Sequence, residues 1–232
     1  SIAPVQQIML PGSPRIGVVL RRSKRARRMS LRVSRLKGLV TLSLPISCPM
    51  AQAEKFVFEK ESWIRAHLAD LPPTAEAMLG GTFLYQGQLL TICPGQGRQV
   101  RAIGEELLVP GPEAMVGARV KAFLKLQARM RLQEATERYA VALGKPYGRL
   151  TLRDTTSRWG SCSTQGNINY SWRLIMAPPE VLNYVAAHEV AHLAEMNHSA
   201  RFWAVVERLF PNHAEQRAWL REHGEDLHRY LF

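Results

Sequence analysis

The stretch that decides how this chain is interpreted runs from Tyr184 to Trp203 and reads YVAAHEVAHLAEMNHSARFW. It places His188 and His192 four residues apart, with Glu189 between them, in an Ala-, Val- and Leu-rich run that predicts a helix. Residues four apart lie on one helical face, so the two imidazoles can bind one metal ion with Glu189 beside it. A buried helix rarely holds such side chains without partners, which favours a metal site over a solvated surface.

A third ligand has to come from elsewhere, because one helical face cannot complete the coordination shell. His198 follows His192 by six residues, beyond the polar step 196–197 where we expect the helix to end and the chain to turn back. Three imidazoles at about 2.0–2.1 Å would leave one zinc position open for water, as in catalytic sites. Glu195, on the same helical face as the two histidines, is the alternative third ligand.

The chain has 232 residues, of which 46% are hydrophobic. This length and composition indicate a globular protein of one large domain or two small ones. No apolar run reaches the roughly 18 residues of a membrane helix, and no secretory signal is evident, so we expect a cytoplasmic enzyme that does not contact membranes. Cys48, Cys93 and Cys162 lie far apart, which indicates neither a disulfide framework nor a thiolate zinc site.

The net charge of +12 favours contact with polyanions, and it is concentrated near the N-terminus. Ten basic residues precede Glu54, the first acidic one: Arg15, Arg21, Arg22, Lys24, Arg25, Arg27, Arg28, Arg32, Arg35 and Lys37. Alternating apolar residues on both sides of Lys37–Gly38 predict a half-buried hairpin with arginines on its wet face. The run is either a solvated strand face or an anion site for a nucleotide or nucleic acid.

The remaining pattern predicts an α+β fold in three parts. Residues 1–15 are expected to be a lead-in, 16–112 a β-rich part with one helix, and 113–232 a helical lobe that carries the metal site. The other expected elements are a helix over 47–70 and a small antiparallel sheet within 81–109. A long helix is expected over 113–143, ended by Gly144 and packed on the metal helix. Two short helices are expected, one over 201–210 and one from 215 to 223.

A second group of residues lies just before the metal helix. Two runs, Arg158–Ser163 and Tyr170–Leu174, flank the polar turn 164–167 and predict a hairpin. Its position suggests a strand that lines the cleft and offers main-chain hydrogen bonds to an extended peptide. Trp159 and Trp172 are expected to pack in the core in either case.

These motifs together resemble the bacterial YgjP-like family of zinc-dependent metallopeptidases. The motifs are Arg158–Trp159–Gly160–Ser161–Cys162, Trp172–Arg173–Leu174, His188–Glu189–Val190–Ala191–His192 and Asn197–His198–Ser199 with Phe202–Trp203. Residues 23–28 and 60–64 also resemble the family. The resemblance covers nearly the whole chain, about 16–228. It implies a zincin-like catalytic lobe related to SprT-like proteases, one Zn²⁺ per chain held by His188, His192 and His198, and Glu189 as the general base.

The histidine spacing is also that of metzincins, but Glu195 stands where those enzymes carry glycine, and no methionine follows His198. Spacing leaves open a thermolysin-like glutamate ligand, Glu207 or Glu215. Arg158, Trp159, Gly160, Ser161 and Tyr184 are the expected substrate-binding residues. Arg158, Tyr170 and Tyr184 are the candidates for stabilising the oxyanion.

Two functions are alternatives to the hydrolysis of peptide bonds in proteins or peptides. Pyrophosphatase activity towards UTP is attributed to the YgjP-like family, and the basic hairpin would hold the triphosphate. Against it, the chain lacks a glycine-rich phosphate loop, and imidazoles suit zinc better than magnesium. The other alternative is a nucleic-acid-associated SprT-like protease or binding module, whose affinity for nucleic acid would fall steeply with salt.

Overall fold

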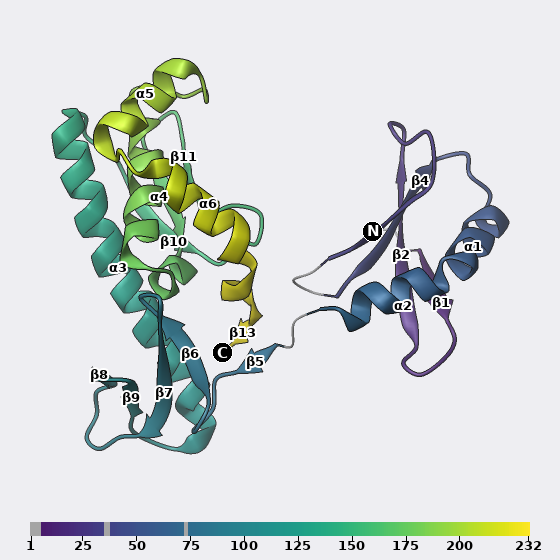
Figure 1. Cartoon of the computed structure of the whole chain (residues 1–232), viewed down its shortest axis with the longest axis horizontal. Coiled ribbons are helices and arrows are strands. Elements are labelled where there is room, and N and C mark those ends of the chain that lie inside the picture. Colours follow the sequence, from purple (N-terminus) through teal and green to yellow (C-terminus); the bar gives the residue numbers. More distant parts are fainter. Residues whose placement is uncertain (1–5, 35–37, 72–73) are drawn as a thin grey trace. The chain divides into compact units, whose positions relative to one another are not determined.

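A computed structural model describes residues 6–34, 38–71 and 74–232. The chain divides into two compact units, which we call the N-terminal unit (residues 1–73) and the C-terminal unit (residues 74–232). Each unit has a hydrophobic core built from its own residues. In both units, runs of strands are followed by runs of helices, as expected for an α+β protein (Figure 1).

The N-terminal unit is a four-stranded sheet with two helices against one face (Figure 1). Its elements are β1 (Gln7–Leu10), β2 (Ile16–Ser23), β3 (Ser30–Val33), β4 (Val40–Pro45), α1 (Met50–Glu59) and α2 (Glu61–Ala69). The strand order is β1-β2-β4-β3, and β2 and β4 alternate buried and half-exposed residues. The buried set packs on Ala53, Val57 and Ile64 of the helices, so this small core is complete within 73 residues.

Two details of this unit differ from the sequence prediction, whereas the predicted hairpin agrees with it. The expected lead-in contains strand β1, which pairs antiparallel with β2 across the Pro11–Pro14 turn; four residues are too few for the alternation to be recognised. The helix expected over 47–70 is two helices that meet at Lys60, where no Gly or Pro signals the break. Strands β3 and β4 are antiparallel neighbours, and Gly38 has a φ of 62°, whereas Lys37 lies outside the described residues.

The C-terminal unit contains two sheets and a strand pair. Its strands are β5 (Ala75–Glu76), β6 (Thr82–Tyr85), β7 (Gln88–Pro94), β8 (Arg101–Ile103), β9 (Glu106–Val109), β10 (Leu150–Arg153), β11 (Gly160–Cys162), β12 (Ile168–Ser171) and β13 (Tyr230–Leu231). The sheet β6-β7-β9-β8 is mixed rather than antiparallel, because β7 and β9 run parallel. The exposed strand β8, which has no apolar alternation to predict it, reverses the chain between them.

The helices of the C-terminal unit pack around the helix that carries the histidines. They are α3 (Val116–Leu143), α4 (Pro179–Ala191), α5 (Ala200–Leu209) and α6 (His213–His223), with 3₁₀ turns at Glu113–Met115, Trp172–Met176 and Gly224–Arg229. Helix α3 ends at Gly144 in the left-handed region (φ 74°) and packs against α4, as predicted. The run 170–174 is a strand only to Ser171, because a 3₁₀ turn comes next in which Ser171 Oγ accepts the Arg173 N–H.

The boundary between the two units lies at residue 73 rather than at 112. Phe83, Leu90, Ile92 and Leu107 of the sheet within 81–109 belong to the same core as α3 and α4. Pro110–Gly111–Pro112 is therefore a turn inside the C-terminal unit and not a linker. Local composition cannot distinguish a turn inside a unit from a linker between units, because a Pro-Gly segment has the same sequence in both cases.

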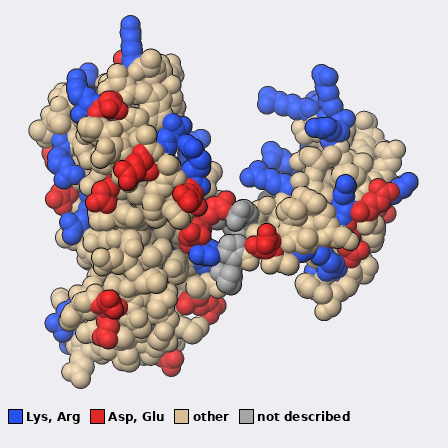
Figure 2. Space-filling model, viewed as in Figure 1, with Lys and Arg blue, Asp and Glu red and all other residues tan. Residues whose placement is uncertain are grey.

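Charge is divided unequally between the units. The N-terminal unit contains 13 of the 31 Lys and Arg residues but four of the 19 Asp and Glu residues, so it carries +9 of the net +12. Figure 2 shows several basic side chains at the upper end of the N-terminal unit, and others on the C-terminal unit. No helix among the described residues is long and apolar enough to cross a membrane.

Candidate metal centre

Helix α4 presents His188 and His192 from its last turn. Pro179 at its first position supplies a fixed φ suited to a helix start, and nearly every following residue to Ala191 is buried. Because α4 lies in the middle of the core, its four-residue spacing brings both imidazoles to one buried face. His192 is 8% exposed and is the C-cap residue that directly follows α4.

The chain reverses directly after this helix. Helix α4 ends at Ala191, earlier than the expected step at 196–197, and tighter i→i+3 hydrogen bonds come next, such as Ala194 N to Ala191 O at 3.1 Å. Helix α5 then begins at Ala200, and its N-cap is Ser199, whose Oγ accepts the Phe202 N–H at 3.4 Å. This cap starts α5 immediately after His198 and so returns the third imidazole to the first two.

The three imidazoles converge on one point. Their ligand atoms all lie within 4.8 Å of one another, and His188 Nε2 and His198 Nε2 are 3.3 Å apart. Two nitrogens bound to zinc at about 2.0–2.1 Å in a tetrahedron are separated by about 3.3 Å. The donor set and its spacing therefore fit a zinc ion.

Hydrogen bonds on the outer ring nitrogens orient two of these imidazoles. His192 Nδ1 lies 3.0 Å from the Glu195 carbonyl oxygen, which can only accept, so Nδ1 carries the proton and Nε2 keeps its lone pair. His188 Nδ1 lies 3.3 Å from the Tyr184 hydroxyl. Burial raises the pKa of Tyr184 to about 12, so this hydroxyl stays protonated. Such outer partners set which nitrogen is free to bind a metal.

Phe202 packs against all three imidazoles. Its ring centroid lies 4.3 Å from that of His192, in a stacked arrangement, and 4.9 Å from those of His188 and His198. Phe202 is fully buried. Burial, followed by the neighbouring histidines, lowers the pKa of His188 to about 3, and burial also lowers the pKa of His192. Both imidazoles are therefore neutral at pH 7, as metal ligands must be.

Glu189 is a buried carboxylate beside this cluster. It is 4% exposed, its Oε1 lies 3.7 Å from His188 Nε2, and its Oε2 has no hydrogen-bond partner among the described residues. Burial raises the pKa of Glu189 to about 8, which the Arg158 guanidinium partly opposes. An unpartnered carboxylate oxygen is costly to bury, and a bound group that contacts it would offset this cost.

Two cavities are lined by both His188 and Glu189. The first, the histidine cavity, has a volume of about 470 Å³ and is lined by Arg158, Gly160, Ser161, Cys162, Met196 and the three histidines. The second, the α6 cavity, has a volume of about 370 Å³ and is lined by Trp159, Gly160, Tyr184, Val185, Arg217, Leu220 and Arg221. Each of the five expected substrate-binding residues lines one of the two.

The remaining ligand candidates and one oxyanion candidate, Tyr170, do not belong to this cluster. Among the described residues, neither Glu195, Glu207 nor Glu215 joins the metal-binding group, and Glu207 instead pairs with His213 at 2.6 Å. Tyr170 is fully buried, and its hydroxyl is 2.8 Å from Thr136 Oγ1, so it is not free to bind an oxyanion. Burial raises its pKa further.

Strand β11 forms one wall of both cavities and has an open edge. It pairs antiparallel with β12, as predicted, and is the outer strand of the sheet β10-β12-β11. Trp159 O accepts from Ser171 N, and Ser163 N donates to Asn167 O. Because main-chain groups alternate in such a ladder, those of Gly160 and Cys162 face the open edge. A Cβ on Gly160 would lie 2.9 Å from Glu189 Cγ, so only glycine fits against Glu189.

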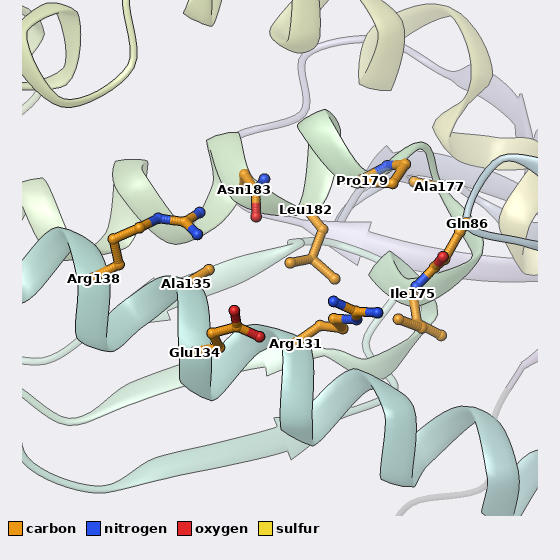
Figure 3. Close-up of a pocket in the computed structure, with 10 residues that line it drawn as sticks. All are labelled: Gln86, Arg131, Glu134, Ala135, Arg138, Ile175, Ala177, Pro179, Leu182 and Asn183. Atoms are coloured by element: carbon orange, nitrogen blue, oxygen red, sulfur yellow. The ribbon is translucent and has the colours of Figure 1, made fainter.

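A further cavity, of about 170 Å³, lies between α3 and the first half of α4 (Figure 3). Arg131, Glu134 and Arg138 reach into it from α3, and Leu182 and Asn183 face them from α4. It contains none of the three histidines and none of the expected substrate-binding residues.

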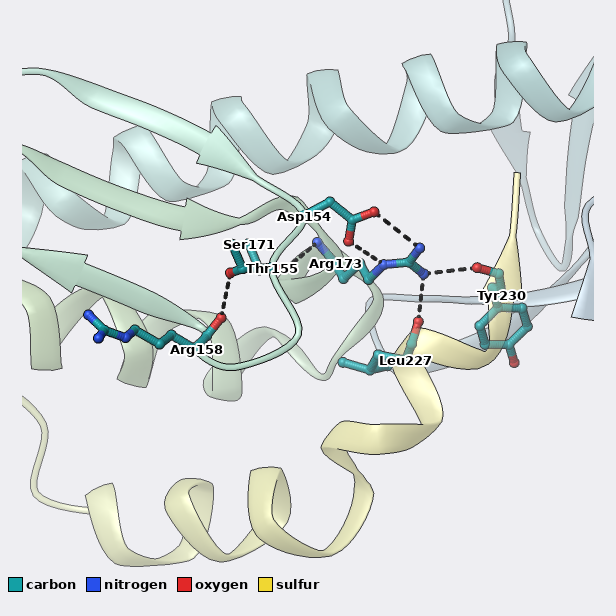
Figure 4. Close-up of polar contacts among 7 residues, drawn as sticks. All are labelled: Asp154, Thr155, Arg158, Ser171, Arg173, Leu227 and Tyr230. Atoms are coloured by element: carbon teal, nitrogen blue, oxygen red, sulfur yellow. Dashed lines mark hydrogen bonds and ion pairs between the residues drawn. The ribbon is translucent and has the colours of Figure 1, made fainter. Parts of the chain in front are cut away.

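The sequence does not indicate that Arg217, Leu220 and Arg221 belong to the site. These residues lie at least 25 residues beyond His192. Their helix, α6, is held in place by the 3₁₀ turn and short strand at its C-terminal end (Figure 4). Arg173, 7% exposed, donates to Leu227 O at 2.8 Å and to Tyr230 O at 3.0 Å, and pairs with Asp154 at 2.7 Å. The periodicity of α6 predicts a helix but not the neighbour it packs on.

Comparisons with known proteins identify similar sequences and structures. The family model described as "YgjP-like, metallopeptidase domain" matches residues 27–223. Similar solved structures include two metallopeptidase zymogens. Abylysin of Pyrococcus abyssi is 24% identical over 39% of this chain and 93% of its own, and jannalysin of Methanocaldococcus jannaschii is 14% identical over 39% and 94%; both have a TM-score of 0.35. No curated protein matches the chain significantly.

Proposed function

Since the chain belongs to the YgjP-like metallopeptidase family, we propose that it hydrolyses peptide bonds in proteins or peptides with one zinc ion. His188, His192 and His198 are the proposed ligands, and Glu189 is the proposed general base. The observation that carries this proposal is the convergence of three imidazoles beside a buried carboxylate whose Oε2 has no partner among the described residues.

Zinc in such a site lowers the pKa of a bound water towards about 7 and polarises a carbonyl group. Glu189 supplies the proton transfers: it accepts a proton from the attacking water and returns it to the leaving amine nitrogen. A neighbouring cation favours the charged form of a carboxyl group, so a bound metal would lower the raised pKa of Glu189 and would allow it to act as a base at neutral pH. Arg158, which lines the histidine cavity, is the proposed partner of the developing oxyanion.

We further propose that the substrate binds as an extended strand along β11. The main-chain groups of Gly160 and Cys162 at the open edge would pair with the peptide, as in other cases of strand addition. Such pairing holds the scissile bond next to Glu189, because Gly160 is in contact with this side chain. Main-chain recognition supports activity on many sequences, and the cavity walls then select among them.

Metal content and turnover test the assignment together. Wild-type protein is expected to bind one zinc ion and cleave unfolded protein, His198→Ala to lose most of the metal, and Glu189→Gln to keep the metal and lose turnover by at least about 100-fold, the usual contribution of a general base. Turnover retained in Glu189→Gln would remove Glu189 from the mechanism. Release of pyrophosphate from UTP by the same zinc-loaded samples, without peptide cleavage, would instead establish the nucleotide hydrolase.

A second role, binding of nucleic acid, is favoured by the N-terminal unit. Six exposed basic residues on or near β2 and β3 have no ion pair with any described residue: Arg21, Lys24, Arg25, Arg27, Arg28 and Arg32. Arg22 differs, because its guanidinium donates to the carbonyls of Ile46 and Cys48 and so has a structural role. Arg35 and Lys37 lie outside the described residues. Binding to duplex DNA should weaken steeply with salt, and salt-insensitive or absent binding would exclude this role.

A further inference from the structure

The α6 cavity is part of the same cleft as the histidine cavity, because Gly160, His188 and Glu189 line both. A peptide that lies along β11 with its scissile bond at Glu189 therefore places neighbouring residues in the α6 cavity. This step rests on the proposed peptidase function. It makes the side chains of the α6 cavity candidates for recognising a substrate group close to the cleaved bond.

The lining of the α6 cavity combines apolar and cationic side chains. Trp159, Val185 and Leu220 supply apolar surface, and Arg217 and Arg221 supply two guanidinium groups. The two arginines are four residues apart on α6, so they lie on one helical face. Among the described residues, the only acidic side chain that lines the cavity is Glu189, which also faces the histidine cavity.

Neither arginine is neutralised by the described part of the chain. No carboxylate there forms an ion pair with Arg217 or Arg221, although Arg229 and Arg173 nearby are both paired. Arg217 is nevertheless held in position, because its guanidinium lies over the Trp203 ring at 4.7 Å. A guanidinium that is oriented by stacking and has its donors free is suited to binding a carboxylate through two hydrogen bonds.

Arg208 shows what a merely solvated arginine looks like in this unit. It is exposed in the last turn of α5, lines neither cavity and stacks on no ring of the described residues. Arg217 differs on each of the last two points. A role in helix stability alone would explain Arg221, which lies in the last turn of α6, but not Arg217, which lies in the middle of the helix.

We propose that the α6 cavity binds a carboxylate of the peptide substrate, with Arg217 and Arg221 as its donors, and so determines specificity near the scissile bond. The carboxylate is either an Asp or Glu side chain or the free C-terminus of the peptide. Both would be received by the same fork of N–H donors, and peptides that carry only one of the two groups near the bond separate them.

The test uses zinc-loaded full-length protein and peptides of one sequence in which Glu or its isostere Gln occupies each position near the bond, with a free or amidated C-terminus. Cleavage rates are measured by mass spectrometry for wild type, for Arg217→Gln/Arg221→Gln and for the control Arg208→Gln. Wild type and control should prefer one carboxylate-bearing series about tenfold, as expected for a hydrogen bond between charged groups, and the double variant should lose the preference.

Each outcome decides the proposal. Preference for Glu at one position identifies a side-chain carboxylate, and preference for the free over the amidated end identifies the C-terminus; both support it. Equal rates in wild type, or a preference that survives in the double variant, overturn it while leaving the peptidase function intact. If no peptide is cleaved, the peptidase function fails, and binding of the same peptides by calorimetry decides whether the arginines still discriminate Glu from Gln.

Discussion

At the scale of single residues, the three imidazoles depend on one aromatic ring. Phe202 is the only described side chain in ring contact with all three histidines, and it stacks on His192 at 4.3 Å. Each imidazole can rotate about the bonds of its own side chain. A rigid neighbouring ring reduces the number of orientations available to the imidazole. Packing against Phe202 therefore holds the three imidazoles in the arrangement that we propose to bind the metal.

Replacement of this ring should weaken the metal site without unfolding the protein. We expect Phe202→Leu to lower zinc affinity by about tenfold or more, the effect usual for partners that orient metal ligands. Competition with a fluorescent chelator measures the affinity. Phe123→Leu, in α3 and in contact with Tyr85 rather than with a histidine, is the matched control and should leave the affinity unchanged.

The raised pKa of Glu189 predicts how stability depends on pH in the metal-free protein. The folded-state pKa of about 8 lies above the ordinary value of 4.5, so the folded protein keeps a proton that the unfolded chain loses. This group therefore makes stability fall as pH rises from about 4.5 to 8. Glu189→Gln cannot ionise and should remove this loss, whereas the histidines act equally in both proteins.

Unfolding with denaturant in the presence of a chelator tests this at pH 5 and pH 8. Each pKa unit corresponds to about 1.4 kcal/mol, so the stability gained by Glu189→Gln should be larger at pH 8 by about 2–4 kcal/mol. A gain of the same size at both values would mean that Glu189 is ionised in the folded protein at pH 5. Zinc should reduce the difference, because a nearby cation favours the carboxylate.

At the scale of elements, the cleft is assembled from pieces that pack around α4. Strand β11 lies along one side of this helix, α5 returns His198 and Phe202 to its end, and α6 supplies the two arginines. Helix α6 and the segment after it are attached through Arg173, which bonds to two main-chain carbonyls of that segment (Figure 4). The α6 wall of the cleft therefore depends on a residue that lies in neither cavity.

Loss of this attachment should destabilise the C-terminal unit. Arg173→Met would leave the carbonyls of Leu227 and Tyr230 without their donor, and we expect it to lower the free energy of unfolding by about 2–3 kcal/mol, as for other buried bonds to charged groups. Arg229→Met, which removes a half-exposed ion pair with Asp226, should cost less than about 1 kcal/mol. Equal losses in the two variants would contradict the anchoring role of Arg173.

At the scale of the whole molecule, the chain is two units with different properties. The C-terminal unit contains the three histidines, Glu189 and both cavities, and the N-terminal unit carries most of the net charge. Each has a core that is closed by its own residues. Zinc binding is therefore a proposed property of the second unit, and contact with polyanions is a proposed property of the first.

Separation of the units should separate these properties. A fragment of residues 74–232 is expected to fold and to bind zinc within about twofold of the full chain's affinity, because all ligands and their packing partners lie within it. The same fragment should show little salt-sensitive binding to DNA, since it carries a net charge of +3 instead of +12. Zinc binding lost with residues 1–73 would show that the two units depend on each other.

Local sequence signals were sufficient for part of this picture. The helix that carries His188 and His192, the long helix ended by Gly144 and the β11–β12 hairpin are specified within short windows, because helical spacing, a glycine cap and a polar turn act over a few residues. Short or exposed strands such as β1 and β8 carry no alternation to recognise. The break at Lys60 has no local marker either.

By itself, the sequence determined that two imidazoles and a glutamate share a helical turn, since spacing along a helix is a local property. Only the tertiary structure decided that His198 rather than Glu195, Glu207 or Glu215 meets them, because this depends on where α4 ends and α5 begins. It also decided that Arg217 and Arg221 line the cleft. Packing between elements far apart in the chain brings these groups together, and no window of sequence contains that information.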